Sequence, residues 1–150
     1  MVEYAKTKVD NVVDICSIVT ALRADLRNRI CKTEAHDFPE IFYMSQGRGS
    51  TEVNGVTHHL EAGQMIIYAP GADHGKGHGG IAEIVSFETT PPLPAEFCNR
   101  VITLTGEQRV AFREIVALAV PLFEMRIGVK GFALKSHADL YALQRVKNKL

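Results

Sequence analysis

The middle of the chain alternates between apolar and polar positions in short runs that are separated by turn residues. Successive side chains of a strand point to opposite faces, so this alternation predicts strands with one buried face. Asn54-Gly55 lies between two such runs and predicts a tight hairpin, because both residues tolerate a positive φ. Such short strands and frequent turns indicate a β-sandwich or a small barrel. We expect strands at residues 40–46, 50–53, 56–60, 64–69 and 81–87.

Two segments beside these runs have less regular patterns. The four glycines between positions 75 and 80 predict a loose loop. Residues 9–32 contain a β-branched cluster that favours a strand, although residues 21–26 are also compatible with a helix. We expect mostly strand and loop over this N-terminal part. The cluster consists of Val12, Val13, Ile15, Ile18 and Val19.

The hydrophobic period changes after three prolines at positions 91, 92 and 94, which mark the exit from the strand-rich part. Thr105, with Gln108 three residues later, predicts a helix that begins with a capping box. Pro121 should bend or end this helix, because proline lacks the backbone N–H that the helix needs. The expected apolar stripe is Val110, Ile115, Leu118, Leu122 and Phe123.

A second helix is expected near the end of the chain, with Ser136 as its cap and His137 in its first turn. Its apolar stripe either packs on the barrel or forms an antiparallel dimer seam, and the spacing alone does not decide between them. Because this helix still runs at Leu150 without a cap, we expect the chain to be a fragment of a longer protein. The stripe consists of Leu140, Leu143, Val146 and Leu150.

Composition narrows the class of protein. The 150 residues suit one domain with a real core, and 46% of them are hydrophobic. A net charge of zero argues against a surface that binds nucleic acid over its whole extent. The three cysteines are far apart and fit a reducing compartment, and no apolar run approaches the roughly 20 residues of a membrane span. We therefore expect a soluble cytoplasmic protein.

Candidate chemistry gathers in the segment that leads into the first central strand. Glu34, His36 and Glu40 share parity, so in one extended strand they would share a face, although Pro39 interrupts the pattern. A histidine and two carboxylates on one face would form half of a metal site, which His74 from a later strand could complete. Such ligands suit Fe, Mn, Ni, Zn or Cu. Phe38, Phe42 and Met44 have the same parity.

Other candidates have weaker support. His58 and His59 are neighbours in an expected strand and therefore point to opposite faces, so they cannot chelate one ion. Phe42 and Tyr68 belong to the expected core, which in a small barrel is also the wall of a pocket. Arg29 could reach an anionic ligand, although an exposed position is the commoner outcome for an arginine.

The order and spacing of these motifs resemble a known family. Glu34-x-His36-xxx-Glu40-xxxxxx-Gly47 resembles the first cupin motif, with Glu34 where metal cupins usually have a histidine. The stretch from Gly63 to His74 resembles the second. More narrowly, HDFPEIFYM followed by QGRG, NG and PGADH resembles the N-terminal effector-binding domain of AraC-family transcription regulators. The chain departs from that family at Pro39, where an aromatic residue is usual, and at Gln64, where aspartate is frequent.

The resemblance implies a mainly β fold, a cupin-like double-stranded β-helix (jelly-roll) barrel followed by two α-helices. It implies a barrel at residues 1–104 that binds a small-molecule effector, and a helical segment at 105–150 that forms a homodimer. DNA would be bound by a C-terminal helix-turn-helix domain that this chain lacks. In this sensor we expect no catalysis and no cofactor. The expected effector-binding residues are His36, Glu40, Phe42, Tyr68, His74 and Arg29, and the expected dimer contacts are Leu140, Leu143, Val146 and Leu150.

Two other function classes remain open. A metal-dependent cupin enzyme of the dioxygenase or isomerase type would hold a divalent transition metal through His36, Glu40, His74 and Glu34. A purely structural dimerisation module would instead have a filled barrel, with a packed interior around Phe42 and Tyr68. Metal analysis and the size of the interior cavity distinguish these classes from a sensor.

Overall fold

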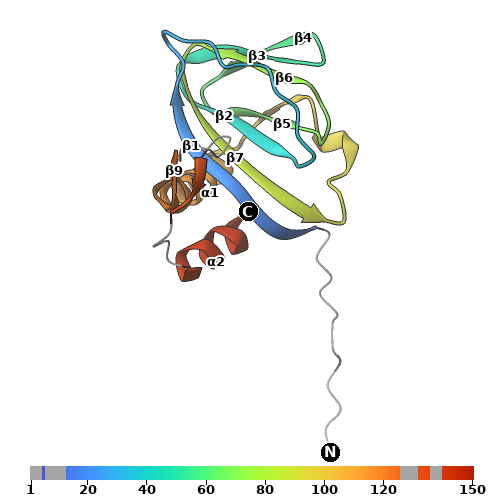
Figure 1. Cartoon of the computed structure of the whole chain (residues 1–150), viewed down its shortest axis with the longest axis vertical. Coiled ribbons are helices and arrows are strands. Elements are labelled where there is room, and N and C mark those ends of the chain that lie inside the picture. The colour runs from blue at the N-terminus through green and yellow to red at the C-terminus, as the bar shows by residue number, and fades with distance from the viewer. Residues whose placement is uncertain (1–4, 6–12, 126–131, 136–139) are drawn as a thin grey trace, which may run out of the picture.

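The protein, described here by a computed structural model, is a barrel of two facing antiparallel sheets with two helices on one side (Figure 1). The structure describes residues 5, 13–125, 132–135 and 140–150. The mainly β, jelly-roll type of fold is therefore confirmed. The five-stranded sheet has the order β1 (Asp14–Asp25), β7 (Ile81–Thr90), β2 (Glu40–Gln46), β5 (Gln64–Tyr68) and β8 (Val101–Thr103). The three-stranded sheet has the order β4 (Val56–Glu61), β3 (Arg48–Val53) and β6 (His74–His78).

Strand β2 lies in the middle of the larger sheet and is buried on both of its faces. Phe42 and Met44 point into the barrel, where they pack with Leu60 and Ile66 of the interior core. Their neighbours in the strand point the other way and pack in a second core, outside the barrel. This double burial explains why EIFYM reads as a nearly continuous apolar run.

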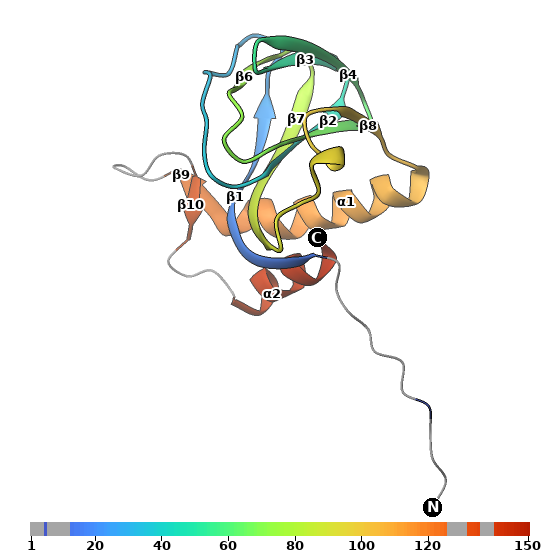
Figure 2. The ribbon, with the colours of Figure 1, turned by 90° about the vertical axis from the view of Figure 1, so that its right-hand side faces the viewer.

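Helix α1 (Gly106–Ala119) covers the outer face of the five-stranded sheet (Figure 2). The predicted capping box is confirmed, because the Thr105 side chain accepts from the Gln108 backbone and Gln108 accepts from the Thr105 backbone. The helix stops before Pro121 and continues as a short 3₁₀ turn at Val120–Leu122. Its buried face is set by Phe112, Ile115 and Ala119. The expected stripe was wrong at Val110, which is 51% exposed.

Helix α2 (Leu140–Lys149) packs beside α1 and the first half of β1. Val146 is fully buried in the outer core, and Leu143 and Leu150 pack against the same core. Leu140 is 72% exposed, so the stripe is divided between packing within the chain and the surface. Ser136 and His137, the expected cap and first-turn residue, lie outside the described residues.

The glycine-rich stretch after His74 is strand β6 and not the expected loose loop. Gly75 passes so close to the preceding segment that an added Cβ would lie 2.3 Å from the Lys32 carbonyl oxygen. Gly77 lies under the Phe42 ring, with 3.2 Å from an added Cβ to the nearest ring carbon. Glycine is used here because backbone and rings approach closely, which a composition-based reading mistakes for a loop.

Other differences from the sequence prediction concern short elements. The helical alternative for residues 21–26 is wrong, since β1 runs to Asp25 and pairs with β7 along its length. Strand β8 was missed, as were the short 3₁₀ turn at Ala95–Phe97 and the hairpin of β9 (Phe123–Met125) and β10 (Phe132–Leu134). Among the described residues, no helix has the length and apolar character needed to cross a bilayer.

Candidate functional site

The candidate site lies where the segment before β2 crosses the start of β6. Glu34 and His74 exchange two backbone hydrogen bonds, from Glu34 N to His74 O at 2.8 Å and from His74 N to Glu34 O at 2.9 Å. Glu40 begins β2, between Tyr68 of β5 and Ser86 of β7. The two sequence motifs therefore meet at one end of the barrel.

The expected strand at residues 40–46 is confirmed, but Glu34 and His36 do not belong to it, so the condition of one extended strand from Glu34 is not met. The strand begins only at Glu40, because Pro39 and the bend before it interrupt the backbone pairing. The expected side chains nevertheless converge, because the isolated bridge to His74 brings Glu34 to the barrel and the intervening loop turns His36 back over Glu40.

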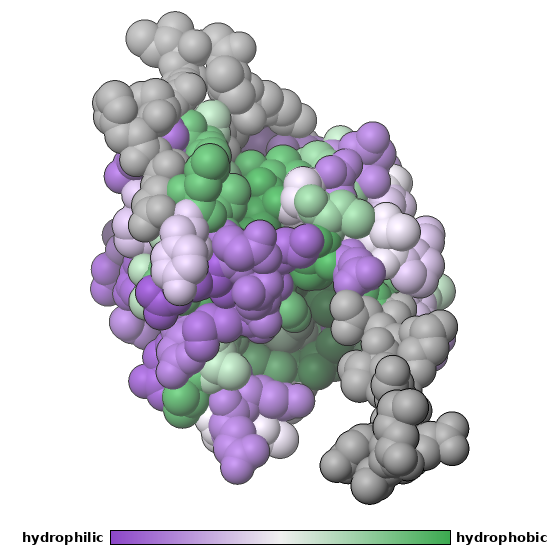
Figure 3. All heavy atoms as spheres, turned by 90° about the horizontal axis from the view of Figure 1, so that it is seen from below, coloured by the Kyte–Doolittle hydropathy of each residue, from purple (hydrophilic) through white to green (hydrophobic). Residues whose placement is uncertain are grey.

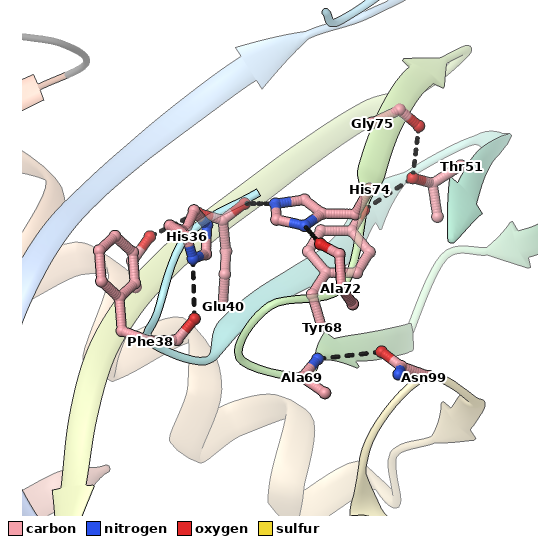
Figure 4. A network of polar contacts seen from close by, with 11 residues as sticks. His36, Phe38, Glu40, Thr51, Tyr68, Ala69, Ala72, His74, Gly75 and Asn99 are labelled. Carbon is pink, nitrogen blue, oxygen red and sulfur yellow. Dashed lines mark hydrogen bonds and ion pairs between the residues drawn. The ribbon is translucent and has the colours of Figure 1, made fainter. Parts of the chain in front are cut away.

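Four side chains form what we call the entrance cluster: Glu34, His36, Glu40 and His74. One potential ligand atom from each lies within 4.8 Å of the others. His36 Nε2 is 3.4 Å from Glu40 Oε2, and His74 Nε2 is 3.7 Å from Glu40 Oε1 (Figure 4). His74 is 2% exposed and Glu40 is 7% exposed, so that these polar groups are shielded from solvent.

Backbone contacts fix the orientation of both imidazole rings. His36 Nδ1 is 2.8 Å from the Phe38 carbonyl oxygen, and His74 Nδ1 is 2.8 Å from that of Ala72 (Figure 4). A carbonyl oxygen only accepts, so Nδ1 carries the proton in both rings. Both Nε2 atoms then point at Glu40, are buried and have no hydrogen-bond partner among the described residues.

Glu40 is itself held in place from the opposite strand. Ser86 Oγ donates to Glu40 Oε2 at 2.5 Å, and Ser86 is fully buried. Burial lowers the pKa of His36, but the adjacent Glu40 carboxylate, the Phe38 carbonyl and the Glu34 charge outweigh it, so this pKa is raised. The separation of 3.4 Å between His36 and Glu40 is nevertheless longer than an ordinary N–H···O hydrogen bond.

The barrel interior beside the cluster is largely filled. A cavity of about 40 Å³ remains, and the entrance cluster supplies three of its lining residues, Glu34, Glu40 and His74. Phe42 and Tyr68 also line it, and each is 2% exposed. The interior around this pair is thus packed, as the structural-module alternative expects, but it is not closed completely. The remaining space suits an ion with one or two water-sized molecules.

Tyr68 joins the cluster to the smaller sheet. Its ring stacks on His74 with centroids 4.2 Å apart, and its hydroxyl lies 2.7 Å from Thr51 Oγ1. Thr51 in turn donates to the Gly75 carbonyl oxygen at 2.9 Å. Burial raises the pKa of the Tyr68 phenol, so the hydroxyl stays protonated.

The remaining candidates lie away from the cluster. Arg29 is exposed and does not line the cavity, so the structure does not bring it to the other expected effector-binding residues. On β4, His58 is half-buried and His59 is exposed, as expected for strand neighbours. His78 lies at the far end of β6, where its ring contacts Ser50 Oγ.

A larger apolar cavity was missed by the sequence prediction. It measures about 340 Å³ and lies between the outer face of the five-stranded sheet and α1. Ile41, Phe87 and Phe112 line it, with Gln108 at its polar side. Seen from below, the molecule has an apolar hollow bordered by hydrophilic side chains (Figure 3). The residues that line this cavity come from distant parts of the chain, so no local sequence motif indicates it.

The chain is similar to known proteins over the part that contains the entrance cluster. The family model described as the AraC-like ligand binding domain matches residues 18–83. One similar solved structure is an RmlC-like cupin from Shewanella frigidimarina, with 20% identity and a TM-score of 0.41. That match covers 57% of this chain and 87% of the cupin. No curated protein matches the sequence significantly. The family match runs from β1 into β7 and includes all four cluster residues.

Proposed function

We propose that the protein senses a small-molecule effector with the segment of residues 18–83, which matches the family model of the AraC-like ligand binding domain. The role is regulatory. The effector binds at the barrel entrance, where His36, Glu40 and His74 supply the polar contacts and Phe42 and Tyr68 form the apolar wall. The cavity of about 40 Å³ between them has to widen to admit it. This division resembles ligand pockets in general, which are mainly apolar with a few fixed polar groups.

The observation that carries the proposal is the pair of buried imidazole nitrogens that point at Glu40 without a partner. An unsatisfied buried polar group costs about 1–3 kcal/mol, so a fold retains two of them only where something else satisfies them. Nε2 lone pairs and carboxylate oxygens accept hydrogen bonds. The effector should therefore be rich in donors, such as a small amine or polyol, and the exposed Arg29 does not line the cavity.

Strand β2 supports a route from effector to helices. Glu40 and Phe42 face the cluster and cavity, whereas Ile41 and Tyr43 face the outer core. The Tyr43 ring packs on Phe112 of α1, with centroids 4.8 Å apart. If β2 has two positions, an effector that binds one of them more tightly increases the population of that position. The helices packed on β2 then change with it.

In this proposal the protein is a homodimer, and effector binding changes the arrangement of its two subunits. The exposed apolar residues of α2, Leu140 and Tyr141, provide its contact, and the helices transmit a change in β2 to the partner subunit. Any contact with DNA belongs to a separate helix-turn-helix domain of the same regulator.

A thermal-shift screen of small amines, polyols and neutral metabolites tests the sensor, because a true ligand stabilises the folded state by mass action. Hits are confirmed by calorimetry and repeated on His74→Gln and on the matched control His59→Gln, which changes an exposed histidine of β4. The proposal expects loss of binding in the first variant and unchanged binding in the second. A hit that both variants bind equally lies elsewhere, and a screen without any hit counts against sensing.

A metal-dependent cupin enzyme is the second candidate, and the four potential ligands of the entrance cluster favour it. Catalysis would also require an open coordination position and a neighbouring acid or base. Turnover of a substrate that disappears in Glu34→Gln, with effector binding absent, would favour the enzyme over the sensor.

A further inference from the structure

We propose that the apolar cavity between the five-stranded sheet and α1 is a second ligand site, which binds an uncharged, mostly hydrocarbon molecule with one oxygen acceptor. We call this space the outer cavity. It lies on the opposite face of β2 from the entrance cluster, because Ile41 lines it whereas Glu40 and Phe42 line the cavity inside the barrel. The outer cavity is thus a separate site, and its occupation does not depend on effector binding at the entrance.

The outer cavity is enclosed by elements from distant parts of the chain. Its floor is formed by strands β1, β2, β5 and β7, and its roof by α1, which runs along the outer face of this sheet (Figure 2). Leu150 lies against it from the end of the chain. Phe87, Phe112 and Ile115 are buried residues of the lining, so the cavity reaches into the outer core. Its volume of about 340 Å³ is within the range of ligand pockets, which measure about 300–1,000 Å³.

The lining of the outer cavity favours an apolar ligand. Among the described residues that line it, Gln108 has the only polar side chain, and none is charged. A cavity of about 150 Å³ lined by leucine, isoleucine and phenylalanine stays dry and binds benzene, because water finds no hydrogen-bond partners there. The outer cavity is more than twice as large and has the same kind of lining. Met65 adds a flexible thioether side chain, which adapts to ligands of different shape.

Gln108 indicates the one polar group that the ligand carries. Its Oε1 accepts from the Thr105 backbone N–H at 2.9 Å, as part of the capping box. This bond fixes the side chain and leaves the amide N–H groups as donors. A ketone or ester oxygen of the ligand accepts a hydrogen bond from this amide.

The charges around the outer cavity argue against an anionic ligand. A buried carboxylate needs a paired cation or several donors, and the described lining offers only Gln108. Ala111 lines the cavity from an exposed position on α1, and its neighbours one turn away on either side are Glu107 and Glu114. The Lys149 ammonium lies 2.8 Å from the Glu114 carboxylate and is thus already paired. We therefore expect an uncharged ligand and not a fatty-acid anion.

The shape of this region favours a small molecule over a second protein chain. Stable protein–protein contacts bury about 800 Å² on each partner over a broad patch. Here the apolar side chains line a hollow that hydrophilic side chains border (Figure 3). The exposed apolar residues of α2, Leu140 and Tyr141, do not belong to the lining. The proposed dimer contact and the outer cavity are therefore different surfaces.

Fluorescence titration with N-phenylnaphthylamine, an uncharged apolar probe, tests the outer cavity. We expect one saturable site per chain, from which methyl octyl ketone displaces the probe. Ala111→Phe narrows the cavity from an exposed position and should weaken probe binding at least about tenfold. Ala117→Phe is the matched control, because Ala117 is an exposed alanine of the same helix outside the lining, and it should leave probe affinity unchanged. Absent binding, or equal affinity in the two variants, overturns the inference.

Competition among ten-carbon compounds tests the class of ligand. Decanoate should displace the probe at least about tenfold more weakly than methyl octyl ketone, because its charge has no partner in the lining. Gln108→Glu keeps an acceptor for the Thr105 N–H and removes the amide donor. It should weaken the ketone by about threefold to tenfold and change the affinity for decane less. Decanoate that binds as tightly as the ketone, or equal changes for ketone and decane, would overturn this ligand class.

Methionine methyl spectra of the unchanged sequence locate the ligand even if a variant fails to fold. Met65 lines the outer cavity, whereas Met44 is fully buried inside the barrel. Methyl octyl ketone should shift the Met65 signal and leave that of Met44 in place. A Met44 shift as large as that of Met65 would put the ligand inside the barrel and overturn the outer site.

Sedimentation velocity distinguishes a ligand site from a contact between subunits. Ala111→Phe should leave the sedimentation coefficient unchanged. A changed coefficient with intact probe binding would assign this region to a subunit contact and overturn the inference. His74→Gln should leave probe binding unchanged, because His74 does not line the outer cavity. Failure of the sensor and failure of the second site are therefore distinguishable.

Discussion

The His74 imidazole lies nearly parallel to the Tyr68 ring, with an interplanar angle of 19° and centroids 4.2 Å apart. This stacking fixes the imidazole plane, while the Ala72 carbonyl fixes its rotation. The Tyr68 hydroxyl continues the connection to Thr51 in the smaller sheet. The orientation of a histidine in the candidate site thus depends on contacts with both sheets of the barrel.

Tyr68→Phe should preserve the stacking and remove only the hydroxyl contact. Thr51 still donates to Gly75, so we expect a modest loss, about 1 kcal/mol in the free energy of unfolding. Chemical denaturation of the variant and of the unchanged protein measures the loss. A loss above about 3 kcal/mol would mean that the hydroxyl also supports groups beyond Thr51.

Ser86→Ala should affect the entrance cluster more strongly. The Glu40 carboxylate loses its buried donor, and hydrogen bonds to charged groups contribute about 1.5–3 kcal/mol. Ser45→Ala is the control outside the entrance cluster. Its half-buried hydroxyl donates to the Ile81 carbonyl and lies beside the Glu83 carboxyl, and its loss should cost less, about 0.5–1.5 kcal/mol. Both variants are compared by urea denaturation in EDTA. Equal losses would mean that the bond from Ser86 to Glu40 contributes no more to stability than the contacts of Ser45.

The sequence predicted the central strands well because their pattern is local. Alternation, Asn54-Gly55 and the Thr105 capping box each depend on neighbours within a few residues. Strand β6 was missed because its glycines are explained by the Lys32 carbonyl and the Phe42 ring, which come from elsewhere in the chain. Strand β8 was missed for a similar reason, since its three residues are strand only through pairing with β5.

In the candidate site, too, local features were predicted from the sequence and contacts between distant residues were not. Spacing and residue type selected His36, Glu40 and His74 correctly as neighbours, although no single strand aligns them. Ser86 was missed, because a serine within an apolar strand carries no local signal of its partner Glu40. The size of the interior cavity also depends on how Phe42 and Tyr68 pack together, which no sequence pattern specifies.

Glu83 predicts a pH dependence of stability. Burial raises the pKa of this carboxyl from 4.5 against the opposing effect of Arg23, which lies 3.0 Å away. The folded state then holds its proton to higher pH than the unfolded state, so this group's contribution to stability falls as pH rises above about 4.5. The fall ends above the folded pKa. In Glu83→Gln this contribution is absent.

Denaturation of the unchanged protein and Glu83→Gln at several pH values measures this effect. The stability difference between them should move in favour of the variant as pH rises through the window, and then stay level. A constant difference at every pH would show that the Glu83 pKa is the same folded and unfolded.

The reactivity of Cys31 tests whether a metal ion binds at the entrance cluster, as the enzyme alternative requires. It lines the same small cavity as Glu34 and Glu40, and burial raises the pKa of its thiol. An ion at the entrance cluster should hold the surrounding segment closed and slow alkylation of Cys31. Cys98 is a matched internal control, half-buried with a pKa also raised by burial. Mass spectrometry after iodoacetamide treatment, with Zn²⁺ or EDTA, measures both sites. Equal protection of both cysteines would indicate general stabilisation and not a local site.

The last prediction separates packing from dimerisation on α2. Val146 is fully buried within its own chain, so Val146→Ala should cost about 2 kcal/mol of unfolding free energy, from two lost methylene equivalents. Leu140 is exposed, so Leu140→Ser should change the stability of the monomer by less than about 0.5 kcal/mol. If α2 forms the proposed homodimer contact, this variant should shift sedimentation velocity profiles towards monomer. Lys147→Ser is its control on the same helix. Two outcomes would rule out α2 as the contact: an unchanged dimer in Leu140→Ser, or a monomer in the unchanged protein at every concentration. If Leu140 were buried in a dimer interface, replacing it with serine would remove apolar contact area that no other residue replaces.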